Sequence, residues 1–242
     1  TDVAMAAGFG SLRRLNDRFK KWYRLSPTGL GKQAANREGP EDSVSPLLGH
    51  RPPYQWDRTL AFLAARAIPG VEVVSDGQYK RTVHHISPGQ EHLYGWLCVE
   101  HRPGKNALAV RLSSSLLPVL THVLARVRNL FDLHCCPDAV EETLSTMNQV
   151  KPGLFVPGTR LPGCFDPFEM SVRAVLGQQI TVKAASTLAG RIAEAYGVPV
   201  ATGIERRTRT FPSAGEVAAL KGDIANHLGP LGVTRTRANT IY

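Results

Sequence analysis

Apolar residues recur at three- and four-residue steps in two stretches of the middle of the chain, the spacing of amphipathic helices. One helix is predicted over Leu60–Ala67, where Pro69 and Gly70 end it, and another over Leu117–Phe131. Strand-rich residues and turn signals occupy the region between them. The expected strands are Val71–Val74, Tyr79–Ile86, Gly95–Glu100 and Ala107–Leu112. This order of elements predicts a small α+β domain over residues 52–165.

The last part of the chain, residues 166–242, has helical patterns only. Asp166, Pro167 and Glu169 match the N-cap, first and third positions of a capping box. A second helix is expected to end at Gly197, with the glycine in the left-handed conformation. Further helices are predicted near Ser213 and from Arg235–Tyr242. We therefore expect an all-helical domain to follow the α+β domain.

Residues 1–30 predict a short helical module with an apolar face and a basic face. Six basic residues and one acidic residue, Asp17, lie between Arg13 and Arg24. A DNA-recognition helix needs this division, because one face docks on its scaffold and the other enters the major groove. An ordinary surface helix with solvated charges is the alternative. The polar, Gly- and Pro-containing residues 31–51 are interpreted as a linker.

The composition favours a polyanionic partner. The 242 residues include 29 Lys and Arg against 20 Asp and Glu, a formal net charge of +9. Nucleic acid and an anionic membrane both suit this charge. No apolar run reaches the length of a transmembrane helix, and the N-terminus does not resemble a secretory signal. We expect a monomeric, cytoplasmic protein that does not associate with membranes.

The chain lacks the usual spacings of metal and nucleophile sites. Its four cysteines form no C-x-x-C pair, and its eight histidines form no H-E-x-x-H motif. Neither a Walker A loop nor a G-x-S-x-G elbow occurs. We expect reduced, mostly buried cysteines, no metal and no cofactor. The basic cluster at Glu205–Arg209 either contacts phosphate or lies in a solvated loop.

The first thirty residues resemble a known DNA-binding module. The pattern A-x-x-x-G-F-x-S, followed by R-F-K-K-x-Y-R-x-S-P, is similar to the second helix-turn-helix of AraC-type regulators. The resemblance implies that the polar face contacts DNA. The DNA-contacting residues it implies are Arg13, Arg14, Asn16 and Asp17.

Residues 52–242 resemble the DNA-3-methyladenine glycosylase II family of the helix-hairpin-helix glycosylase superfamily. The strongest block is Val172–Ala185 (VRAVLGQQITVKAA), and Arg160–Glu169 (RLPGCFDPFE) precedes it. Earlier blocks are Pro52–Trp56, Leu60–Ala67 and Asn129–Cys135. The resemblance implies an α+β fold: a TATA-binding-protein-like domain, then an all-helical helix-hairpin-helix domain. It also implies double-stranded DNA with alkylated bases as the partner.

The family acts on a base that has been rotated out of the duplex, and something must fill the gap. By the resemblance, Gln179 is the residue that enters the base stack, with Gln178 and Ile180 beside it. The alternative is that the two glutamines form a polar break between helices on the surface.

Alkylated purines such as 3-methyladenine are cationic in DNA, and an aromatic pocket binds a cation by stacking and cation–π attraction. Phe62 and Arg66 correspond to pocket-side positions of the family's first helix. Phe62 as an ordinary core residue is the alternative.

We assign no catalytic residue. Glu205, Glu216 and Asp223 do not stand in the hairpin context of the family's catalytic aspartate, which we expect beyond Tyr242 of a fragment. Three hypotheses follow: a glycosylase fused to a DNA-binding regulatory module, an AraC-type transcriptional regulator of the alkylation response, and a non-catalytic DNA-binding relative.

Overall fold

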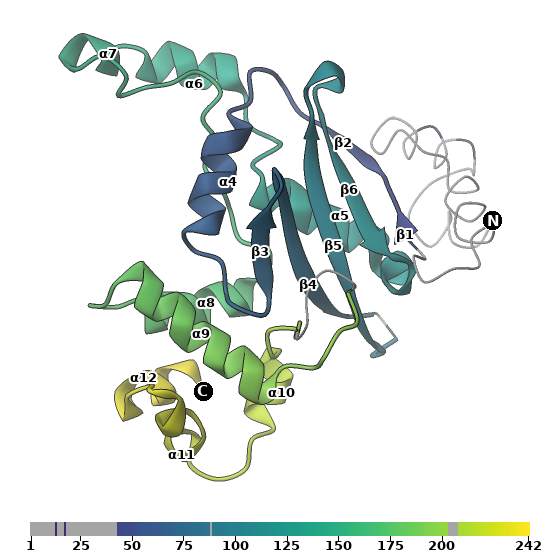
Figure 1. Cartoon of the computed structure of the whole chain (residues 1–242), viewed down its shortest axis with the longest axis vertical. Helices are drawn as coiled ribbons and strands as arrows, with labels where there is room; N and C mark the ends of the chain where they lie inside the picture. The colour runs from purple at the N-terminus through teal and green to yellow at the C-terminus, as the bar shows by residue number, and fades with distance from the viewer. Residues whose placement is uncertain (1–12, 14–16, 18–42, 88, 203–207) are drawn as a thin grey trace.

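The computed structural model describes residues 13, 17, 43–87, 89–202 and 208–242. Its centre is an antiparallel sheet in the order β1-β6-β5-β4-β3, with β2 also paired to β6 (Figure 1). The strands are β1 (Ser43–Val44), β2 (Leu47–Gly49), β3 (Glu72–Ser75), β4 (Gln78–Ile86), β5 (His92–Arg102) and β6 (Ala107–Ser113). The four strands predicted from the sequence are confirmed.

The interpretation of residues 31–51 as a linker is wrong for its last part. Ser43 and Val44 pair with β6, and Leu47–Gly49 pair with the same strand further along. Strands of two and three residues are too short to show an alternating pattern, so their sequence is indistinguishable from a polar connection. Val44 and Leu48 are buried in the core all the same.

Two helices cover one face of the sheet. Helix α4 (Trp56–Ala64) and helix α5 (Leu120–Leu130) bury their apolar sides against it, and Figure 1 shows α5 behind the strands. The helix predicted over Leu117–Phe131 begins later than expected. Pro118 lies in a 3-10 segment, η2 (Ser114–Val119), because proline lacks the N–H that an α-helix interior needs.

A short arm follows α5. Helices α6 (Pro137–Leu144) and α7 (Met147–Val150) extend to the upper left of Figure 1, away from the sheet. Several of their apolar side chains are exposed, including Met147 and Val150.

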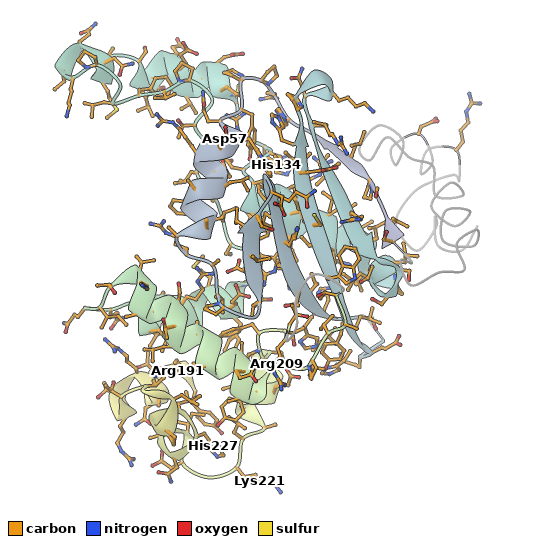
Figure 2. All side chains as sticks on the ribbon, in the orientation of Figure 1. Asp57, His134, Arg191, Arg209, Lys221 and His227 are labelled. Atoms are coloured by element: carbon orange, nitrogen blue, oxygen red, sulfur yellow. The ribbon has the colours of Figure 1, made fainter. Side chains whose placement is uncertain are left out.

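The second half is a cluster of helices with its own core. These are α8 (Pro167–Leu176), α9 (Val182–Tyr196), α10 (Ala214–Ala218), α11 (Ile224–Leu228), the 3-10 segment η3 (Gly229–Leu231) and α12 (Arg235–Ile241). Arg191, labelled in Figure 2 between α9 and the last helices, donates to the Leu231 carbonyl at 3.0 Å. Helix α11 was not predicted, because five residues complete too few turns for a periodic pattern.

None of the helices in the described part of the chain combines the length and the apolar character needed to cross a bilayer.

Gly197 follows α9, but the predicted left-handed cap is wrong. Its backbone is extended, with φ −79° and ψ 154°. A Cβ atom here would lie 1.9 Å from the Thr210 carbonyl oxygen, so the position requires glycine for a close approach of two backbones. The chain returns beside this residue, where Thr210 N donates to the Val198 carbonyl at 2.9 Å.

Replacing Gly197 by alanine should therefore destabilise the protein by about 1–3 kcal/mol, because the methyl group must displace backbone. The matched control is Gly215→Ala in α10, where an added Cβ would meet no described residue outside its own helical turn within 4 Å. That change should be neutral or stabilise by up to about 1 kcal/mol. Urea unfolding of both variants measures the difference, and equal effects would contradict the close-approach explanation.

Candidate functional site

A cavity of about 340 Å³ lies where the sheet and the second group of helices meet. The end of α4 lines it from the sheet side, and α8, α9 and the turn between them line it from the other. Its polar and aromatic walls comprise Phe62, Arg66, Glu72, Arg81, Phe165, Glu169, Arg173 and Ser186. Phe62, Arg66 and Ile180, which were predicted separately from the sequence, therefore lie around one cavity.

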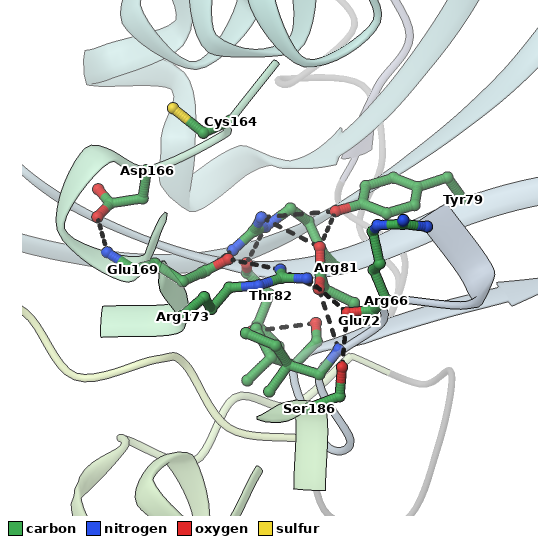
Figure 3. A network of polar contacts seen from close by, with 12 residues as sticks. Arg66, Glu72, Tyr79, Arg81, Thr82, Cys164, Asp166, Glu169, Arg173 and Ser186 are labelled. Carbon is green, nitrogen blue, oxygen red and sulfur yellow. Dashed lines mark hydrogen bonds and ion pairs between the residues drawn. The ribbon is translucent and has the colours of Figure 1, made fainter. Parts of the chain in front are cut away.

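A buried ion network forms one wall of this cavity (Figure 3). The Arg81 guanidinium on β4 contacts Glu169 on α8 at 2.6 Å and Glu72 on β3 at 3.5 Å. Arg173 on α8 reaches the same two carboxylates, at 3.1 Å for Glu72 and 3.6 Å for Glu169. Tyr79 donates to Glu72 at 2.5 Å. The network thus joins the sheet to α8.

Burial shapes the ionisation of this network. Only 6% of Arg81 and 4% of Glu169 is exposed. Burial raises the pKa of the Glu169 carboxyl, which the nearby Arg81 opposes. Burial also disfavours the charge on Arg81, but attraction by Glu169 and other neighbours outweighs it and raises the pKa of Arg81 well above its ordinary range. Arg81 therefore keeps its positive charge inside the protein.

Helix α8 begins as the sequence predicts, but Glu169 has a different role. Asp166 is the N-cap and accepts from the Glu169 backbone N–H at 3.0 Å. The Glu169 carboxylate, which was expected to complete the capping box, contacts Arg81 and Arg173 instead. A buried guanidinium attracts this carboxylate more strongly than an uncharged backbone N–H does.

Phe62 and Arg66, the two residues predicted for a base pocket, both line this cavity. Phe62 is 38% exposed, so it is not an ordinary core residue. The Arg66 guanidinium carbon lies 3.7 Å from the centre of the Phe62 ring.

The turn between α8 and α9 carries the two glutamines. Gln179 adopts a left-handed backbone conformation, with φ 57°, and both glutamines are exposed. Ile180 is half-buried, packs on the second core and lines the cavity. Thr181 caps α9 by accepting from Ala184 N, and the Gln178 carbonyl accepts from Arg237 on α12. The turn is therefore held at both ends while the glutamine side chains remain exposed.

The sequence did not predict the buried ion network. Arg81 stands between Tyr79 and Val83, two buried residues on the core-facing side of β4. A basic residue on the apolar side of a strand was the available signal, because a buried charge needs a partner. The sequence does not show that Glu72, Glu169 and Arg173 supply the other charges.

The predicted N-terminal DNA contacts are only partly described. Arg13 and Asp17 are exposed, whereas Arg14 and Asn16 lie outside the described residues, as do Glu205–Arg207.

The cysteines are free, but the expectation that most are buried is wrong. Cys98 is buried, Cys135 and Cys164 are half-buried, and Cys136 is exposed. No cluster of potential metal ligands occurs among the residues that the structure describes.

A larger hollow of about 850 Å³ lies on the face of the sheet that α4 and α5 leave open, around Cys98, Glu100 and Arg111. It is lined by none of the residues predicted for base binding. The smaller cavity is the stronger candidate, because an exposed aromatic ring, buried charges and an exposed interhelical turn converge on it.

Comparison with known proteins identifies relatives of this chain. Residues 47–166 match the family model of the AlkA N-terminal domain. The chain is 36% identical over 245 residues to a "probable bifunctional transcriptional activator/DNA repair enzyme AlkA" of Mycobacterium tuberculosis, covering 99% of this chain and 47% of that protein. It is 40% identical over 150 residues to DNA-3-methyladenine glycosylase 2 of Escherichia coli, covering 62% of this chain and 50% of that protein. The chain thus spans about half the length of these curated relatives.

Solved structures support the fold. A 3-methyladenine DNA-glycosylase from Archaeoglobus fulgidus aligns with a TM-score of 0.63 at 16% identity, covering 81% of this chain and 64% of that one. A Clostridium acetobutylicum 8-oxoguanine glycosylase/lyase in complex with double-stranded DNA aligns with a TM-score of 0.53 at 14% identity, covering 81% and 60%. The predicted α+β fold class is confirmed.

Breaking the buried network should destabilise the protein strongly. Arg81→Met leaves the Glu169 carboxylate buried beside one guanidinium fewer, which should cost about 3–5 kcal/mol in unfolding free energy. The control is Glu194→Gln, which removes an exposed partner of Arg209 and should change stability by less than about 1 kcal/mol. Urea unfolding measures both, and a small effect of Arg81→Met would show that the network contributes little.

Proposed function

Since this chain belongs to the DNA-3-methyladenine glycosylase II family, we propose that it supplies the base-binding cavity of a cytoplasmic repair enzyme. The enzyme hydrolyses the N-glycosidic bond of alkylated purines in double-stranded DNA. The observation that carries this proposal is the cavity of about 340 Å³, which an exposed Phe62 lines beside the exposed turn of Gln178 and Gln179.

The cavity is suited to a flipped base. Its volume falls within the range of small-molecule sites, about 300–1,000 Å³. Phe62 offers an aromatic surface to a purine, and the buried network provides a rigid wall. A rotated nucleotide thus finds a stacking partner within a firm enclosure.

The turn beside the cavity is suited to filling the gap that the base leaves. We infer that Gln179 enters the duplex and hydrogen-bonds the unpaired base opposite, with Gln178 and Ile180 supporting it. The anchoring of the turn through Thr181 and Arg237 supports this role, because a residue that enters the stack must resist displacement.

No residue of this chain is proposed as the catalytic group. Both carboxylates that line the cavity, Glu72 and Glu169, are engaged by Arg81 and Arg173. Neither is therefore free to stabilise the positive charge that develops on the sugar as the base leaves.

We further propose a regulatory DNA-binding module in residues 1–30, with Arg13, Arg14, Asn16 and Asp17 facing DNA. The name of the mycobacterial relative, which aligns over 99% of this chain, includes transcriptional activation. In this organisation a linker ends before Ser43, the sheet domain extends to residue 165 and the helical domain follows. The protein is proposed to act as a monomer.

Binding of this chain to duplex DNA should weaken steeply with salt. Its net charge is +9, and each phosphate contact contributes about −0.9 to the slope of log K against log salt. We expect a loss of roughly tenfold or more between low and physiological salt, measured by fluorescence anisotropy. Arg13→Ala with Arg14→Ala should reduce the slope by about 1–2. An affinity that does not change with salt would contradict DNA binding through the basic residues.

The full-length gene product should release 3-methyladenine from methylated duplex DNA, and Gln179→Ala should slow this release several-fold. The reason is that a flipped base returns to the stack more easily when the gap stays open. Gln149→Ala is the matched control, since Gln149 is an exposed glutamine on α7 that does not line the cavity. Single-turnover release rates measure the effect, and wild-type rates for Gln179→Ala would refute the role of the turn.

A further inference from the structure

One face of the partly exposed Phe62 ring is already covered by a cation from its own chain. The Arg66 guanidinium carbon lies 3.7 Å from the ring centre, and Arg66 Nη1 donates to the Phe62 carbonyl at 3.2 Å. Both residues line the cavity. One face of the ring on which a cationic base would stack is therefore occupied in the free protein.

Arg66 also leaves the cavity with an excess of positive charge. Of the charged residues that line it, Glu72 and Glu169 are paired with Arg81 and Arg173. None of the ion pairs formed within the described residues includes Arg66. Two negative and three positive side chains sum to +1, which repels a second cation.

The backbone of Arg66 is held while its side chain is not. The Arg66 carbonyl accepts from Arg173 Nη2 at 2.6 Å and from Ser186 Oγ at 3.2 Å, which ties it to α8 and α9 (Figure 3). Among the residues that the structure describes, the guanidinium makes only the stacking contact and one hydrogen bond within a turn of its own segment. Rotation about side-chain bonds can thus uncover Phe62 without moving the wall of the cavity.

We propose that Arg66 is a displaceable gate. In the free protein its guanidinium blocks the Phe62 ring against cationic purines, and on DNA the guanidinium moves off the ring and pairs with a phosphate. This inference rests on the proposed base-binding role of the cavity. Arginine suits the task, because its planar guanidinium exchanges an aromatic face for a charge-assisted, bidentate contact with phosphate. Contact with DNA then both opens the ring and removes the repelling charge.

The test measures charge selectivity in this chain without DNA. Calorimetry in mildly acidic buffer compares 7-methylguanosine, which keeps its N1 proton and its positive charge there, with guanosine, its neutral counterpart. Arg66→Gln removes the charge and should tighten binding of the cationic probe by about fivefold, with little change for guanosine. Arg66→Lys keeps the charge and should not show this gain. In Phe62→Leu the gain from Arg66→Gln should vanish, because the ring is the surface that the gate releases.

Three results would overturn the gate. The first is weaker binding of the cationic probe by Arg66→Gln, which would make Arg66 a direct ligand. The second is an equal gain in affinity for both nucleosides, which would indicate that the smaller side chain only enlarges the cavity. The third is absence of binding of 7-methylguanosine to Arg66→Gln, because an opened ring must bind it.

A second measurement follows the movement itself. In the free protein the Arg66 Nε–H resonance should carry a ring-current shift from Phe62, identified by its loss in Arg66→Lys. Undamaged duplex DNA should abolish this shift, and a shift that persists in the complex would exclude displacement by phosphate.

The two proposals fail separately. If the gate is wrong but the cavity binds bases, both nucleosides bind the wild-type chain and Phe62→Leu weakens them. If base binding is wrong, Phe62→Leu leaves the affinity for either nucleoside unchanged.

Discussion

The buried pairing of Arg81 with Glu72 and Glu169 is the interaction on which the described part of the structure depends. These charges come from β4, β3 and α8, so the network can form only when the sheet and the helical half are together. Removing charges from water is costly, and the cost is recovered only when each charge meets a well-placed opposite charge. Arg173 completes the arrangement by reaching both carboxylates. The network therefore stabilises the contact between the sheet and the helical half, and it also determines how the two halves are oriented against each other.

The same network determines the chemistry of the cavity beside it. Because Glu72 and Glu169 are already paired, the wall presents balanced charge to whatever enters. Among the described charged residues that line the cavity, Arg66 is the one without an ion-pair partner, and its guanidinium lies over the exposed ring of Phe62. A simple aromatic pocket would attract any cation at any time. When a guanidinium covers the ring, a cation can bind there only after an anion has drawn the guanidinium away. DNA presents such an anion, a phosphate, at every nucleotide.

Helix α8 connects the buried network to the turn at the edge of the cavity. Its first turn is capped by Asp166, its buried side is tied to β4 through Glu169, and its last turn leads into Gln178 and Gln179. The turn is then fixed by Thr181 at the start of α9 and by Arg237 from α12. A rigid helix thus places exposed polar side chains beside a cavity, an arrangement that suits a protein that must separate a base from its neighbours.

The sequence by itself determined what depends on neighbours along the chain. The N-cap of Asp166, the long strands and the amphipathic helices follow from local spacing. The family resemblance singled out Phe62 and Arg66 for a base pocket and Ile180 for the interhelical turn, and only the fold brings the three to one cavity. Tertiary structure alone decided the partners of residues whose position along the chain suggests a partner within the same helix. Glu169 fits a capping box by position, yet a buried arginine from a distant strand attracts its carboxylate more strongly. Gly197 fits a helix cap, yet the approach of Thr210 is what requires it. In each case the contacting atom belongs to another segment of the chain, so the spacing of residues within one segment cannot predict the contact.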